Sequence, residues 1–360
     1  MGRFTKTVDP ISLLLITAIS FFGIFLLLTI SKGLFFSQLE FFLVGIVVVF
    51  LLSSVDGQIY RWFAPIGYIV LCLFLASSYL GPSVRGATRW FEIGGVRLQP
   101  SELAKPLFLL SISYFLTRYP PRTMRHILLH FAIFIVPFFL VFKQPDLGSS
   151  LVYVAMWAAM MVAGGLRIRY AFGAVGFFGI LSPLIYHFLA SYQKSRIITF
   201  LNPALDPKGA GYNAIQAMIA VGSGQWFGRG LGFGTQSHLE FLPEAHTDFI
   251  FASLIEELGL VGGLALFAAY IFLLWRIVSP LIRAEESDAF TYIYSVGLFA
   301  MLLVQIFINT GMNMGIIPVT GITLPLVSYG GSSILSVCTS FGILWAIRTR
   351  SGRMHTIAIR

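Results

Sequence analysis

Long apolar runs separated by short polar stretches fill the chain from one end to the other. Each run is about twenty residues long, which is the length a helix needs to cross the hydrocarbon core of a bilayer. Ten spans are predicted, at residues 11–30, 39–55, 62–80, 101–117, 126–143, 146–164, 170–189, 248–275, 288–310 and 322–347. The pattern therefore predicts an all-α polytopic membrane protein, a single transmembrane domain over residues 1–360 with a long loop, 190–247, between helices seven and eight.

Polar residues at the starts of these runs predict how several helices begin. Asp9 is expected to cap the first helix, with Pro10 at its first position, and Asp146 is expected to cap the sixth. Ser101 is expected to cap the fourth helix, which would place Lys105 about one turn inside the span. A lysine there either extends toward the membrane surface or binds a phosphate beside the helix N-terminus.

Composition agrees with this class, because 57% of the residues are hydrophobic and only 11% are charged. A soluble domain of that composition could not cover itself with polar surface. Basic residues set the orientation, since cytoplasmic loops carry an excess of Lys and Arg. With both termini and the tail 348–360 in the cytoplasm, the inner cations are Arg3, Lys6, Arg61, Arg118, Arg122, Arg125, Arg167, Arg169, Arg276, Arg283, Arg348, Arg350, Arg353 and Arg360. This topology accounts for most of the net charge of +9, so no nucleic-acid partner is predicted.

Further cations lie on the extracytoplasmic side, where topology does not require them. Arg89 and Lys105 belong to the loop and helix start at 81–105, and Arg196 belongs to the long loop. Their presence predicts an anionic ligand on that face. The alternative is that these loops are simply solvated, since long loops do not follow the charge rule.

A glycine-rich polar stretch, 224–247, runs directly into the eighth span. Glu240, Glu244, His246 and Asp248 gather where this loop becomes a membrane helix. A carboxylate there can face water and substrate together. Glu256 and Glu257 follow inside the span on different faces. Lipid exposure of a carboxylate costs a few kcal/mol, so at least one of the two is expected to face a cavity.

Glycine and proline interrupt the apolar pattern between residues 308 and 333. Broken helices at membrane depth are tolerated only where they are buried in protein or line a cavity. The polar side chains of this segment are therefore expected to face a polar cavity and not lipid. They are Asn309, Asn313, Thr320, Thr323, Ser328 and Ser332.

Five motifs occur in order along almost the whole chain. They are Arg89-Trp90 with Gln99-Pro-Ser-Glu-Leu-Ala-Lys105, Gln144-Pro-Asp-Leu-Gly-Ser-Ser150, Asp206-Pro-Lys-Gly-Ala-Gly-Tyr-Asn213, Leu242-Pro-Glu-Ala-His-Thr-Asp-Phe-Ile-Phe251, and Pro318-Val-Thr-Gly321 through Ser328-Tyr-Gly-Gly-Ser-Ser333. Together they resemble the SEDS family (shape, elongation, division and sporulation), the RodA and FtsW polymerases of the bacterial cell wall. The run Gly234-Thr-Gln-Ser-His-Leu-Glu-Phe241 is closer to the RodA branch. Pro243-Glu-Ala-His246 and Asn309-Thr-Gly-Met-Asn313 are closer to the FtsW branch.

The resemblance implies a ten-helix fold and peptidoglycan glycosyltransferase activity in the bacterial inner membrane, with the active site on the extracytoplasmic side. The implied donor is lipid II or a growing glycan on undecaprenyl pyrophosphate, and the acceptor is another lipid II. The implied partner is a class B penicillin-binding protein, a transpeptidase that crosslinks the product.

Inverting displacement of a pyrophosphate requires a base for the attacking hydroxyl and positive charge for the leaving group. The essential aspartate of the family falls at Asp248, so Asp248 is the predicted catalytic residue. The predicted substrate-binding residues are Arg89, Trp90, Lys105, Arg196, Glu244, His246 and Thr247. Two alternatives stay open: Asp248 holds a divalent cation such as Mg²⁺ or Mn²⁺, or it only caps the helix while Glu244 or Glu257 does the chemistry.

Two other function classes fit the same pattern. A lipid II flippase would also use broken helices and a polar cavity, but the candidate groups cluster on one side and no nucleotide-binding motif supplies a driving force. A scaffold that only activates its penicillin-binding partner would tolerate loss of Asp248. Within the family, the division (FtsW-type) polymerase is the alternative to the elongation type.

Overall fold

The computed structural model describes residues 8–81, 90–93, 96–188, 191–206, 209–239, 241–283 and 288–357. Each of the ten predicted spans overlaps an α-helix. The α-helices are α1 (Pro10–Ile30), α2 (Lys32–Ser54), α3 (Gly57–Ser77), α4 (Pro100–Leu103), α5 (Lys105–Arg118), α6 (Met124–Phe142), α7 (Leu147–Ala163), α8 (Ile168–Phe188), α9 (Ser191–Leu201), α10 (Ala210–Ser223), α11 (Thr235–His238), α12 (Ile250–Ile282), α13 (Ala289–Asn313) and α14 (Gly331–Ile357). Short 3-10 turns, η2 (Ser78–Leu80) and η3 (Pro203–Leu205), and the antiparallel pair β1 (Phe91–Ile93) and β2 (Val96–Leu98) complete the described elements.

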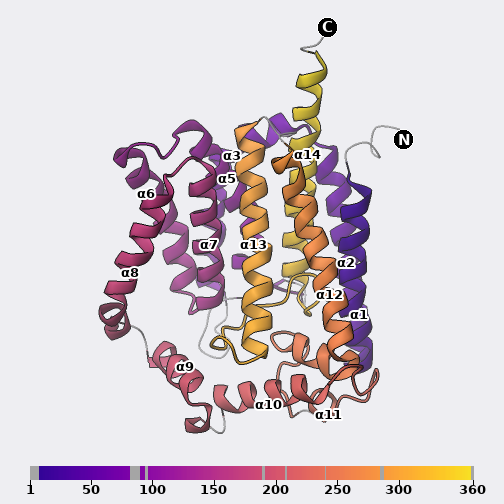
Figure 1. The fold of residues 1–360 in the computed structure, drawn as a ribbon. Helices are drawn as coiled ribbons and strands as arrows, with labels where there is room; N and C mark the ends of the chain where they lie inside the picture. Colours follow the sequence, from indigo (N-terminus) through magenta and orange to yellow (C-terminus); the bar gives the residue numbers. More distant parts are fainter. Residues whose placement is uncertain are drawn as a thin grey trace.

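Seven of the described helices are long and apolar enough to cross a membrane, and α7 is a shorter apolar helix beside them. The protein is therefore a polytopic helical membrane protein. The helices stand side by side as a bundle, with the start of α1 and the end of α14 at one end and α9, α10 and α11 at the other (Figure 1). We call the end with α9 to α11 the loop end. In the bundle, α14 packs along α2 and α13 packs along α7.

The predicted helix starts are confirmed at two places and wrong at a third. Asp9 and Asp146 both cap their helices, and the Asp146 side chain accepts a hydrogen bond from the Ser149 amide. Ser101 is not a cap, because α4 begins at Pro100 after the N-cap Gln99. A break after the single turn of α4 makes Lys105 the first residue of α5, whereas we expected it one turn inside a continuous helix.

Helix α12 is broken within the membrane pattern at Gly259, whose φ of 67° and ψ of −171° lie in a region open essentially to glycine alone. A turn from the long loop fills the break. The amides of Leu260 and Val261 donate to the carbonyls of Gln225 and Trp226, at 2.8 and 3.0 Å. A Cβ at Gly259 would lie 2.3 Å from the Gly228 amide nitrogen, so the close approach requires glycine.

The two glutamates before this break are fully buried, and both contact the long loop. Glu256 accepts hydrogen bonds from the Gln236 amide and the Thr235 hydroxyl, at 2.9 and 3.1 Å, and so satisfies hydrogen-bond donors at the start of α11. Glu257 accepts from the Gly232 amide at 2.9 Å and lies 2.8 Å from Nε2 of His238. The expectation that one of them faces a cavity is therefore wrong: both carboxylates anchor residues 232–238 to α12.

The final membrane helix begins later than predicted. The span expected at 322–347 is a helix only from Gly331, and residues 314–330 form an irregular segment at the loop end of the bundle. Pro318 and Pro325 cannot donate the backbone bonds that a helix needs, and Gly315 and Gly321 adopt φ values of 70° and 78°. This segment, which we call the 314–330 loop, supplies much of the candidate site.

Candidate functional site

A tight turn at residues 243–249 carries the motif that ends in Asp248 and leads into α12. Glu244 has a φ of 55°, a left-handed conformation that costs a non-glycine residue about 1–2 kcal/mol. Its carbonyl accepts hydrogen bonds from the amides of Thr247 and Phe249, at 3.1 and 3.3 Å. The turn therefore folds around a strained residue, a feature that tends to accumulate at functional sites.

Three consecutive carbonyls of this turn are held by other parts of the chain. The His246 carbonyl accepts from the Tyr329 amide at 2.8 Å, and the Thr247 carbonyl accepts from the Ser328 hydroxyl at 2.7 Å. The Asp248 carbonyl accepts from the side-chain amides of Asn309 and Asn313, at 2.9 and 3.0 Å. The backbone that carries Asp248 is thus fixed from two sides, by the 314–330 loop and by the end of α13.

The half-buried side chain of Asp248 points toward the 314–330 loop. A Cβ built at Gly321 would lie 3.3 Å from Oδ2 of Asp248, so the missing side chain lets the carboxylate pack closely against this glycine. Gly321 itself has a φ of 78°, which favours glycine on conformational grounds as well. The carboxylate therefore faces a spot where the backbone carries no side chain.

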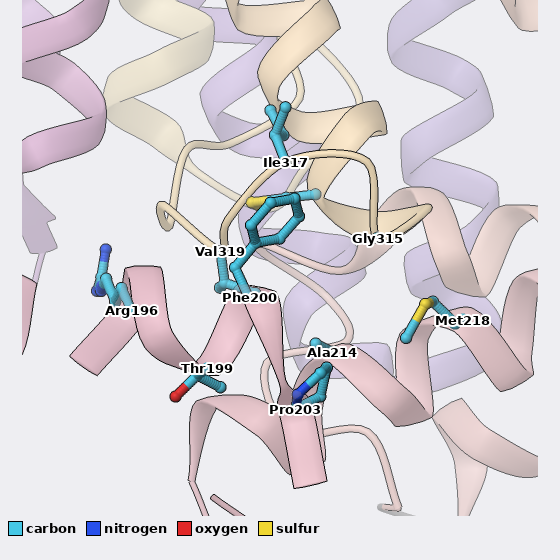
Figure 2. Close-up of a pocket in the computed structure, with 10 residues that line it drawn as sticks. Arg196, Thr199, Phe200, Pro203, Ala214, Met218, Gly315, Ile317 and Val319 are labelled. Carbon is cyan, nitrogen blue, oxygen red and sulfur yellow. The ribbon is translucent and has the colours of Figure 1, made fainter. Parts of the chain in front are cut away.

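Arg196 approaches the same loop from α9. Its Nη1 donates to the Thr320 carbonyl at 3.0 Å, next to Gly321. Figure 2 shows Arg196 at the edge of a small cavity in which Phe200, Ile317 and Val319 gather. The cavity has a volume of about 30 Å³, room for roughly a single water molecule. A sugar or a pyrophosphate cannot bind inside it, so Arg196 could reach such a ligand only from the cavity's edge.

Lys105 lies in a second, more deeply buried polar cluster. Its Nζ is 2.5 Å from Oε1 of Glu102, and both side chains are almost completely buried. Asp146 lies in the same region and accepts from Nε2 of Gln99 at 2.9 Å and from the Ser101 hydroxyl at 3.3 Å. In the structure the partner of Lys105 is a carboxylate. That Lys105 binds phosphate stays a prediction.

Packing connects this second cluster to the turn of Asp248. The Gln99 amide donates to the Ser332 hydroxyl at 2.8 Å, at the start of α14. A Cβ at Gly148 would lie 2.5 Å from Cγ1 of Ile322 and 3.2 Å from the Thr320 carbonyl, so α7 packs directly on the 314–330 loop. Both clusters therefore meet that loop, and they belong to one polar region at the loop end of the bundle.

The remaining predicted residues are placed as follows. Arg89 lies outside the described residues, and Trp90 is half-buried just before β1. The Thr247 hydroxyl donates to the Glu244 carboxylate at 3.3 Å. The ring of His246 packs on Tyr329, and burial lowers its pKa below the ordinary value, although the Glu244 carboxylate acts in the opposite direction. His246 is therefore neutral at pH 7 and can accept or donate a hydrogen bond.

Sequence reasoning missed the partners that hold this site together. Glu102 and Lys105 are three residues apart, a spacing that allows a helical ion pair and could have been noticed. Asn309, Asn313, Ser328 and Ser332 were expected to face a polar cavity, and the expectation that they avoid lipid is confirmed, because all four are buried. In the structure these four side chains form hydrogen bonds mainly with backbone groups of the protein itself.

A metal site is a separate question. Within the described residues, no three His, Cys, Asp or Glu side chains gather in a way that could hold a metal ion. Mg²⁺ is often bound through one or two carboxylates together with substrate phosphates. Asp248 is a single carboxylate that packs against Gly321, so it fits such an ion only if a bound pyrophosphate supplies further ligands.

Known proteins resemble this chain over nearly its whole length. The peptidoglycan glycosyltransferase MrdB of Escherichia coli K12 is 38% identical over 347 residues, 95% of this chain and 93% of the relative. Stage V sporulation protein E of Bacillus subtilis is 35% identical over 316 residues, 85% of this chain and 84% of that protein. A probable peptidoglycan glycosyltransferase FtsW of Nitrosococcus halophilus is 36% identical over 313 residues, covering 84% and 80%.

Solved structures show the same fold. A chain from a peptidoglycan synthase complex, studied for the coordination of polymerization and crosslinking, superposes with a TM-score of 0.84 at 27% identity, covering 96% of this chain and 98% of its own. The rod shape determining protein RodA of Thermus thermophilus superposes with a TM-score of 0.72 at 26% identity, covering 95% and 97%. Residues 4–352 also match the family of cell cycle proteins that comprises FtsW, RodA and SpoVE. The chain therefore belongs to the FtsW/RodA/SpoVE family, the SEDS proteins.

Proposed function

We propose that this protein is a peptidoglycan glycosyltransferase that polymerises lipid II into glycan strands, with Asp248 as its general base. One observation carries the proposal: three successive carbonyls hold the turn of Asp248 in place, while its carboxylate packs against Gly321 of the 314–330 loop. A group held so firmly is already positioned for reaction, which is how a protein lowers the entropic part of a barrier.

In the proposed reaction, the 4-hydroxyl oxygen of the acceptor sugar attacks the anomeric carbon of the donor. A new C–O bond forms while the bond to the pyrophosphate oxygen breaks, and the undecaprenyl pyrophosphate leaves with the electron pair. Asp248 accepts the hydroxyl proton. A divalent cation, if one binds, would be held by Asp248 and would stabilise negative charge on the pyrophosphate.

Positive charge for the leaving group would come from this chain as well. Arg196 reaches the Thr320 carbonyl, one residue from Gly321, and its guanidinium carries five N–H donors. Arginine suits bidentate contact with phosphate oxygens. Arg89 and Lys105 remain the other proposed cations, and the second requires that Lys105 exchange its Glu102 partner for substrate.

We place the active site outside the cytoplasm and both termini in the cytoplasm of a bacterium, in its inner membrane. The charge distribution of the loops supports this orientation. The start of α12, which follows directly after Asp248, lies at the opposite end of the bundle from the start of α1 (Figure 1). A class B penicillin-binding protein is the proposed partner, because a similar chain occurs in a complex that couples polymerization to crosslinking.

An elongation role in cell-shape maintenance is preferred to a division role. The similarity to MrdB extends over 95% of this chain, against 84% for the FtsW of Nitrosococcus halophilus. Similarity to a rod shape determining protein in the solved structures supports the same choice.

The test is polymerisation of lipid II by the purified full-length protein, with and without its penicillin-binding partner, followed by separation of the glycan chains on a gel. We expect Asp248→Asn to abolish chain formation, a loss of at least about 100-fold, while the protein stays folded and inserted. Asp288→Asn is a matched control, because Asp288 caps α13 at the far end of the bundle. Full activity of Asp248→Asn would refute both the base and the metal-ligand roles.

A further inference from the structure

The end of α13 carries two buried asparagines that the proposed reaction does not use. Asn309 and Asn313 are four residues apart, so they lie on one face of the helix, and neither has exposed surface. Both donate a hydrogen bond to the same oxygen, the Asp248 carbonyl, at 2.9 and 3.0 Å. One donor would satisfy the Asp248 carbonyl, so two side-chain amides on it exceed what hydrogen-bond satisfaction requires.

The other bonds of these asparagines extend to both neighbours of the site. Nδ2 of Asn309 also donates to the Ile322 carbonyl at 2.7 Å, one residue after the glycine that faces the Asp248 carboxylate. Oδ1 of Asn313 accepts from the Ala252 amide at 3.0 Å, in the first turn of α12. The pair therefore joins three segments that surround the carboxylate: the turn, the start of α12 and the 314–330 loop.

Chemistry fixes the orientation of the Asn309 amide. Its nitrogen faces two carbonyl oxygens, and a flipped amide would place its own oxygen against both of them. In the observed orientation, Oδ1 of Asn309 is buried and has no hydrogen-bond partner among the described residues. The arrangement leaves one acceptor unsatisfied, a cost of about 1–3 kcal/mol. In return, a single nitrogen holds the backbone oxygens of Asp248 and Ile322.

We propose that Asn309 and Asn313 are positioning residues, which hold the Asp248 carbonyl and the Ile322 carbonyl in place and thereby fix the direction of the Asp248 carboxylate toward the reacting hydroxyl. This inference rests on the proposed function of Asp248. It assigns the two asparagines no contact with substrate. Their effect is on the rate of the reacting complex and not on the binding of lipid II.

The test compares Asn309→Leu and Asn309→Ser with wild type in the lipid II polymerisation assay. Leucine has nearly the shape of asparagine but donates nothing, and serine keeps a single donor on a smaller side chain that is easier to accommodate. We expect kcat to fall roughly 10- to 100-fold for leucine and less for serine, because displacing a reacting group by about 1 Å costs on the order of 100-fold in rate. KM for lipid II should stay within about 3-fold of wild type.

Thr310→Val is the matched control on the same helix. The Thr310 hydroxyl bonds only carbonyls of its own helix, those of Ile306 and Phe307, so its loss perturbs α13 without touching Asp248. Thermal unfolding and gel filtration in detergent give the folded fraction of each variant, and kcat is expressed per folded protein. Thr310→Val should keep a wild-type kcat.

Each outcome decides the question. A kcat per folded protein that stays at the wild-type value in both variants would overturn the inference, and if the leucine variant does not fold, the serine variant decides alone. A rise in KM with kcat unchanged would also overturn it, since that result means substrate binding. Asp248→Asn is measured in parallel: if it is active, the proposed function is wrong, whereas an inactive Asp248→Asn beside fully active asparagine variants refutes only the positioning role.

Discussion

The buried pair of Lys105 and Glu102 allows a sharp test of what this lysine does. The two charged atoms are 2.5 Å apart, and the exposed fractions of the side chains are 1% and 7%. Lys105→Met removes the cation and leaves a carboxylate buried without its partner. Breaking a buried pair in this way costs about 3–5 kcal/mol of unfolding free energy, which corresponds to a fall in Tm on the order of 10 °C.

The double variant Lys105→Met with Glu102→Gln should recover most of that loss. Replacing both members of a buried pair by neutral side chains of similar volume is often neutral or stabilising. The measurement is thermal unfolding of the purified protein in detergent for wild type, both single variants and the double variant, so that the four values give the coupling between the residues. A double variant as unstable as Lys105→Met would refute this reasoning.

The same four proteins separate stability from chemistry in the polymerisation assay. If Lys105 binds the pyrophosphate, the double variant is stable but inactive. If Lys105 only neutralises Glu102, the double variant is stable and active, and the sequence prediction that Lys105 is a substrate ligand is wrong.

Two further predictions follow from the backbone and from the far end of the bundle. Gly259→Ala should lower the unfolding free energy by more than about 3 kcal/mol, because φ at this position is 67° and the added Cβ would lie 2.3 Å from the Gly228 amide nitrogen. A Tm near the wild-type value would contradict this close approach. Burial alone would raise the pKa of Asp288, but hydrogen bonds from Thr291 and the charge of Arg61 outweigh it and lower that pKa. The stabilisation by ionised Asp288 is therefore fully present above about pH 4 and is lost as pH falls through the folded-state pKa of Asp288. The Tm difference between wild type and Asp288→Asn should shrink below pH 4 and stay constant between pH 6 and 8.

Much of the fold was predictable because membrane helices appear in the sequence as long apolar runs. Apolar runs of the right length located every span, and Asp9 and Asp146 marked two helix starts through ordinary capping chemistry. The start of α14 was misplaced because residues 322–330 are apolar enough to continue a span. Hydropathy does not register that Pro325 and Leu326 are not helical, the latter with a φ of 69°.

The site was predictable in its location but not in its contacts. Asp248 and the polar residues of the 314–330 loop were recognisable from their sequence motifs. The partners of Glu256 and Glu257 in the long loop were not, because they are backbone amides and the side chains of Thr235 and His238, some twenty residues earlier in a loop with no periodicity. Hydrogen bonds to backbone carbonyls, such as those from Asn309, carry no sequence signal at the accepting residue.

The break in α12 makes two distant stretches of chain depend on each other. Gln225 and Trp226 accept the bonds that the helix loses at Gly259, and the amides of Arg229 and Gly230 donate back to the carbonyls of Glu256 and Glu257. If either stretch separates from the other, polar backbone groups of both lose their hydrogen-bond partners. The loop and the first part of α12 therefore form one cooperative unit, and any force that pulls on the loop is transmitted directly to the helix that begins beside Asp248.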